Sequence, residues 1–196
     1  MINVMPLVLL AVLVYIGLFV RHLRQRRALS EHLIFTVFYA YIVGVVAVCF
    51  FPLPVQPSLL RSLHQAGYHA AIAWNPLRSL ALTLTHDRLP DIVYSVGGNL
   101  LLLFPLGLLL PLTSAKVSTH TAWITGVVLS ISIEAAQYTL DGVLGFAYRS
   151  PAVEQVVLNG IGCGVGGIVV GRLATRGLLP TYRWTRRMPD SSASAE

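Results

Sequence analysis

The sequence has little charge for its length. Only 11% of its 196 residues are charged, against roughly 25% in soluble domains. At the same time 55% of the residues are hydrophobic and the mean hydropathy is +0.70. A soluble domain of this size could not bury so much apolar surface. The composition therefore excludes a soluble globular protein and indicates an integral membrane protein.

Cysteine is scarce as well, and the sequence offers no convincing metal site. Cys49 and Cys163 both lie within long apolar runs and are not spaced as a metal pair, so we expect buried thiols that pack as small apolar residues. The six histidines are scattered, and His64 and His69, five residues apart, fit metal-ligand spacing poorly. We predict no metal and no cofactor, and the sequence identifies no catalytic residue.

The net charge of +6 does not indicate a nucleic-acid partner, because the arginines cluster at the ends of apolar runs rather than on one polar face. Five such runs approach the roughly 20 residues that cross a bilayer. They cover residues 2–20, 33–53, 92–112, 121–140 and 153–173. The predicted fold is an all-α, polytopic transmembrane helical bundle with about five membrane-spanning helices.

The first apolar run resembles a secretion signal in length only. Its basic residues follow the apolar stretch and no small-residue cleavage site is present, so we interpret it as a retained span. Segment 54–91 is too polar to cross and predicts one or two short interfacial helices. The chain is thus divided into an extra N-terminal transmembrane helix with a basic cytoplasmic loop (1–30), a transmembrane domain (31–175) and a basic cytoplasmic tail with a disordered end (176–196).

Lysine and arginine are distributed unevenly about these spans. Four arginines directly follow the first span, which places that loop in the cytoplasm. Alternation then puts ten Lys and Arg residues on the cytoplasmic side and four outside: Arg61, Arg78, Arg88 and Arg149. The positive-inside rule therefore predicts a multi-pass protein of the bacterial cytoplasmic membrane with an exterior N-terminus and a cytoplasmic C-terminus.

Glu134 lies inside an apolar run, where a carboxylate costs a few kcal/mol on insertion scales and usually has a partner. At 1.5 Å per residue, Asn99, Glu134 and Asn159 all lie about 9–10 Å below the outer ends of their spans. Gln137 shares a helical face with Glu134, and Asp141 follows another turn outward. Arg149, in the next loop, is the nearest cation that could fold over Glu134.

Two interpretations of these residues remain open. The first is a polar pocket open to the outer leaflet and lined by Asn99, Glu134, Gln137, Arg149 and Asn159, with Arg78 at its rim. The second is ordinary contact between helices, since such polar pairs contribute around 0.6 kcal/mol on average. Glycines in the last span, spaced as in Gly160-Gly164 and Gly162-Gly166, favour close helix packing and allow a homo-oligomer through that span.

Several segments resemble the VanZ-like family of membrane proteins. The stretch 99–107 resembles its N-x-x-x-F-x-P-x-G signature, and Glu134-x-x-Gln137, Arg149 and the segment 158–162 follow its C-terminal pattern in order. Segment 75–78 is similar to its exterior loop, and Phe51-Pro52 to the end of its first shared helix. The likeness covers about residues 34–173. The family often has two adjacent acidic residues where this chain has Glu154 followed by Gln155.

The resemblance implies a context rather than a reaction, because the family is named for a component linked to low-level resistance to the glycopeptide teicoplanin. Our leading hypothesis is a pocket that binds a membrane lipid or cell-envelope amphiphile, with Arg149 and Arg78 contacting an anionic headgroup. One alternative is a membrane-embedded enzyme that modifies a headgroup with Glu134 as general base. Another is a structural scaffold assembled through the glycine-rich span.

Overall fold

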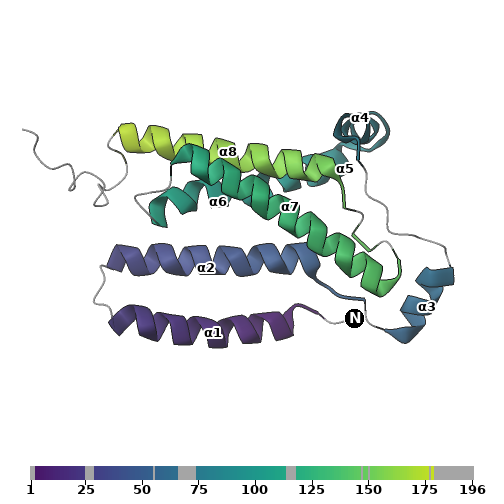
Figure 1. Ribbon diagram of the computed structural model, residues 1–196, viewed down its shortest axis with the longest axis horizontal. Coiled ribbons are helices and arrows are strands. Elements are labelled where there is room, and N and C mark those ends of the chain that lie inside the picture. Colours follow the sequence, from purple (N-terminus) through teal and green to yellow (C-terminus); the bar gives the residue numbers. More distant parts are fainter. Residues whose placement is uncertain are drawn as a thin grey trace, which may run out of the picture.

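The computed structural model describes residues 3–24, 29–54, 56–65, 74–113, 118–146, 148–149, 151–176 and 178, and its regular elements are helices (Figure 1). These are α1 (Met5–Arg24), α2 (Leu29–Phe50), α3 (Pro57–Gln65), α4 (Pro76–His86), α5 (Leu89–Ile92), a π-helical turn η1 (Val93–Gly97), α6 (Gly98–Thr113), α7 (Thr119–Leu144) and α8 (Val153–Thr175). The predicted all-α bundle is confirmed.

Four helical stretches are long and apolar enough to span a membrane: α2, the continuous run through α5, η1 and α6, then α7 and α8. The apolar part of α1, Met5–Arg21, is shorter. Two short helices, α3 and α4, occupy the polar segment in which one or two were expected. The described residues do not include Arg26, Arg27 and Tyr68. They also exclude the tail from residue 179 onward, so its predicted disorder is not tested.

The contacts between the helices show which of them are neighbours in the bundle. α6 and α8 run parallel to each other, α7 lies antiparallel against both, and α2 packs on α6 and α7. α1 lies outermost, beside α2 (Figure 1). The C-terminal ends of α2 and α7 and the N-terminal end of α8 therefore meet at one end of the bundle, close to α4. Because the charge distribution predicts that this end faces outward, we call these the outer ends.

Glycines allow α8 to approach its neighbours closely. A Cβ atom on Gly162 would collide with the carbonyl oxygen of Leu100, and one on Gly166 with that of Phe104. On the other side, a Cβ on Gly164 would lie 2.9 Å from the Trp123 ring of α7. The predicted close packing through the glycine-rich helix is confirmed within the chain. A homo-oligomer through the same helix stays a prediction.

Candidate functional site

A row of polar side chains runs along one face of α7. Ser130, Glu134, Gln137 and Asp141 follow each other at intervals of four, three and four residues, which places them on a single helical face. Ser130 and Asp141 are fully buried, Gln137 is 6% exposed and Glu134 is partly buried. We call these four residues the polar stripe. At 1.5 Å per residue the stripe extends about 16 Å along a membrane span.

The outer end of the stripe orders the loop between α7 and α8. Gly145 ends α7 in the left-handed conformation, with φ of 78°, a backbone region that glycine adopts without strain. The chain then turns back, and the Asp141 carboxylate accepts the backbone N–H groups of Tyr148 at 3.0 Å and of Arg149 at 3.2 Å. Asp141 thus satisfies two loop donors in a buried environment.

Arg149 ties this loop to the end of α2. Its guanidinium Nη2 donates to the carbonyl of Phe51 at 2.7 Å, and its Cζ lies 5.0 Å from the centre of the Tyr148 ring. The Tyr148 hydroxyl donates to the carbonyl of Pro52. Among the described residues Arg149 forms no ion pair with Glu134, the partner that its sequence position suggested.

Glu134 instead receives a backbone donor. Its Oε2 accepts the N–H of Ala152, the residue at the N-terminal cap of α8, at 3.0 Å. Free N–H groups at a helix start carry partial positive charge and favour an anion there. The carboxylate therefore joins the outer half of α7 to the first turn of α8, without a full positive charge from Arg149.

Two amide side chains continue the site inward. Gln137 donates from Nε2 to the carbonyl of Cys49 at 3.0 Å, and Asn159 of α8 donates from Nδ2 to the Ser130 hydroxyl at 2.9 Å. Their oxygens, Gln137 Oε1 and Asn159 Oδ1, are buried and accept no hydrogen bond among the described residues. Since an unsatisfied buried acceptor costs about 1–3 kcal/mol, these two oxygens mark where a donor could bind.

A comparison with models of protein families identifies the family of this chain. The family model VanZ/LLP1 matches residues 38–174, which is 137 of the 196 residues. The chain belongs to the VanZ/LLP1 family. A comparison with curated proteins finds no match, and a comparison with solved structures finds none. The family match includes the whole polar stripe and excludes α1.

The structure brings together part of the predicted VanZ-like site. Glu134, Gln137 and Arg149 meet at the outer ends of α2, α7 and α8. Asn159 is level with Ser130, one helical turn deeper than Glu134. Asn99 forms no hydrogen bond with them within the described part of the chain. Its Nδ2 donates to the carbonyl of Ser95, one turn earlier within the π-helical turn η1, at 2.7 Å.

Arg78 makes its contact away from the stripe. It is exposed in the first turn of α4, and its backbone N–H is accepted by the Asn75 side chain at 3.0 Å, which caps that helix. α4 packs against α8, so Arg78 is placed at the same end of the VanZ-like bundle as the stripe (Figure 1). Its side chain could approach a ligand there only from the rim.

Sequence reasoning missed several residues of the site. Ser130 lies one turn before Glu134 and could have been found by extending the face inward. The backbone carbonyls of Cys49, Phe51 and Pro52 cannot be recognised as partners from the sequence, because every residue has a backbone carbonyl. Glu154 has a buried carboxylate oxygen that accepts no hydrogen bond among the described residues. Among the residues that the structure describes, no group of three His, Cys, Asp or Glu side chains could hold a metal ion.

Proposed function

We propose that this VanZ-like membrane protein binds the headgroup of a lipid or cell-envelope amphiphile at the outer end of the polar stripe. The observation that carries the proposal is Gln137. It is more than nine-tenths buried within a membrane span, between two carboxylates on the same face, and no described residue donates a hydrogen bond to its amide oxygen. An amide alone can serve helix packing, but carboxylates within a membrane span are rare and mark functional sites. The combination with Glu134 and Asp141 therefore supports a binding site.

The chemistry of the stripe suggests what the headgroup offers. Glu134, Glu154, Gln137 and Asn159 present oxygen acceptors, so the ligand would supply donors such as hydroxyl or ammonium groups. The remaining N–H groups of Arg149, with Arg78 at the rim, suit an anionic part of the same headgroup. A headgroup with both donors and an anionic group fits this distribution, and Asn159, one turn deeper than Glu134, would help to orient it.

The predicted orientation places this end of the bundle outside the bacterial cytoplasmic membrane. An amphiphile held there would lie where a lipophilic glycopeptide meets the membrane. We therefore propose a role in protecting the cell envelope against antibiotics of the teicoplanin type. The support for this step is the family match together with the position of the stripe.

The first prediction tests the stripe directly. Glu134→Gln, Arg149→Ala and Asn159→Ala each remove a charge or polar group, and each variant is compared with the wild type at equal membrane insertion. We expect at least one of them to weaken retention of an envelope lipid by about ten-fold or more, the effect of losing one charge-assisted hydrogen bond. The measurement is native mass spectrometry of the full chain from nanodiscs made of total bacterial membrane lipid.

Thr139→Ala is the matched control, because Thr139 is exposed on α7 and its hydroxyl donates to the Ala135 carbonyl of its own helix. Teicoplanin sensitivity of cells that produce each variant at equal level provides a second readout. Unchanged lipid retention and unchanged sensitivity in all three variants would end the proposal. A changed headgroup in the lipids of a deletion strain would favour the enzymatic alternative instead.

A further inference from the structure

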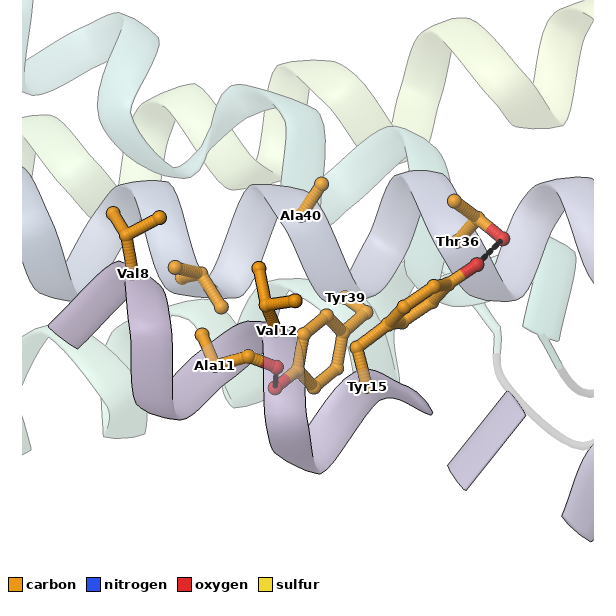
Figure 2. Close-up of a pocket in the computed structure, with 8 residues that line it drawn as sticks. Val8, Ala11, Val12, Tyr15, Thr36, Tyr39 and Ala40 are labelled. Atoms are coloured by element: carbon orange, nitrogen blue, oxygen red, sulfur yellow. Dashed lines mark hydrogen bonds between the residues drawn. The ribbon is translucent and has the colours of Figure 1, made fainter. Parts of the chain in front are cut away.

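A second candidate site lies between α1 and α2, away from the polar stripe. Two tyrosines connect these helices. The Tyr15 hydroxyl bonds to the Thr36 hydroxyl at 2.8 Å, and the Tyr39 hydroxyl donates to the Ala11 carbonyl at 2.7 Å (Figure 2). Their rings lie 5.3 Å apart, centre to centre. Long tyrosine side chains therefore form hydrogen bonds across the contact between the two helices.

This mode of packing leaves a cavity of about 270 Å³. Val8, Ala11 and Val12 line it from α1, and Thr36, Ala40 and Val43 line it from α2 (Figure 2). The alanines are too small to fill the space that the tyrosines keep open. A buried apolar cavity of about 150 Å³ already accepts a benzene molecule, so this cavity has room for a longer apolar group.

The lining offers no polar group for recognition. Both tyrosine hydroxyls are used between the helices, and the Thr36 hydroxyl also donates to the His32 carbonyl at 2.8 Å. An occupant that gains from this surface is therefore purely apolar. Because the cavity lies between two apolar helices of a membrane protein, the available apolar occupant is a lipid acyl chain.

The charge at the end of α1 indicates which lipid. Arg21 and Arg24 are exposed in the last two turns of α1. Tyr15 lies six residues from Arg21 and Val8 lies thirteen, which is about 9 and 20 Å along the helix. One leaflet is about 15 Å deep, so a chain whose headgroup sits at Arg21 reaches the Tyr15 end of the cavity with its distal half. Juxtamembrane arginines attract anionic headgroups.

We propose that the cavity between α1 and α2 binds one acyl chain of an anionic phospholipid, whose phosphate contacts Arg21 and Arg24. The site is independent of the polar stripe. It joins α1, which lies outside the family match, to the VanZ-like bundle through a lipid as well as through the tyrosines.

The second prediction tests this site by photolabelling. The full chain is reconstituted in nanodiscs with phosphatidylglycerol or phosphatidylcholine that carries a diazirine near the end of one acyl chain. We expect label on the peptides that contain Val12 and Ala40, about ten-fold stronger with the anionic lipid than with the zwitterionic one. The double variant Arg21→Gln and Arg24→Gln should keep the label and lose the preference.

Filling the cavity gives the decisive comparison. Ala40→Leu should reduce label at this site several-fold, and Val12→Phe does the same from the other helix if the first variant inserts poorly. Ala135→Leu is the control, because Ala135 is exposed on α7 and lines no part of the cavity. Label spread evenly over all exposed apolar helices would overturn the proposal. An unlabelled cavity with a dimeric mass would show that a second copy occupies it, and would overturn it too.

Discussion

Asp141 shows what a single buried carboxylate does at the end of a membrane helix. It is fully buried and accepts the N–H groups of Tyr148 and Arg149, so it fixes the turn that carries Arg149 back towards α2. The position of Arg149 is therefore set by Asp141 rather than by Glu134.

The third prediction concerns this carboxylate. Asp141→Ala leaves two backbone N–H groups without their acceptor, and each unsatisfied buried donor costs about 1–3 kcal/mol. We expect a lower midpoint of thermal unfolding in detergent, together with weaker lipid retention at the stripe. Thr139→Ala, two residues away on the exposed side, should leave the midpoint unchanged. An equal midpoint for both variants would show that water satisfies the loop donors.

The contacts of the stripe residues were only partly predictable from the sequence. The shared face of Glu134 and Gln137 follows from helical spacing and was predictable. Their partners were not, because the Ala152 N–H and the Cys49 carbonyl are backbone groups that every residue carries. The pairing of Arg149 with Phe51 depends on where α2 ends beside the loop. The sequence does not fix the last residue of a helix closely enough to predict which carbonyl Arg149 meets.

Among the helices, α8 depends most on small residues. The carbonyls of Leu100 and Phe104 lie against the α carbons of Gly162 and Gly166, so α6 and α8 are close because no side chain separates them. The existence of these spans was predictable from length and apolarity. Which helix each glycine contacts was not, since spacing alone serves packing within the chain and packing between copies equally well.

The fourth prediction follows from that contact. Gly162→Ala inserts a methyl group against the Leu100 carbonyl and forces α6 and α8 apart. Overpacking of this kind costs about 1–3 kcal/mol, so we expect a lower unfolding midpoint in detergent. Gly142→Ala is the control, because a Cβ there meets nothing within 4 Å and alanine favours the helix by roughly 0.5–1 kcal/mol. A harmless Gly162→Ala would mean that α6 shifts freely against α8.

Across the whole molecule, the two ends of the bundle differ in chemistry. The stripe, the ordered loop, α3 and α4 lie at one end, together with four arginines: Arg61, Arg78, Arg88 and Arg149. Arg21, Arg24, Arg172 and Arg176 lie at the other end, as the ends of α1 and α8 place them (Figure 1). The described arginines number four at each end, so the predicted exterior position of the stripe rests on the ten-to-four ratio of the full sequence and stays a prediction.

The fifth prediction tests this orientation with two single cysteine substitutions. Ser58→Cys in α3 and Thr175→Cys at the end of α8 are both exposed, whereas the native Cys49 and Cys163 are buried and should react little. A membrane-impermeant maleimide added to intact cells should label Ser58→Cys, and it should label Thr175→Cys only after lysis. The reverse pattern would place the stripe in the cytoplasmic leaflet. A headgroup site for an exterior amphiphile would then be impossible, whereas lipid binding between α1 and α2 would still be open to test.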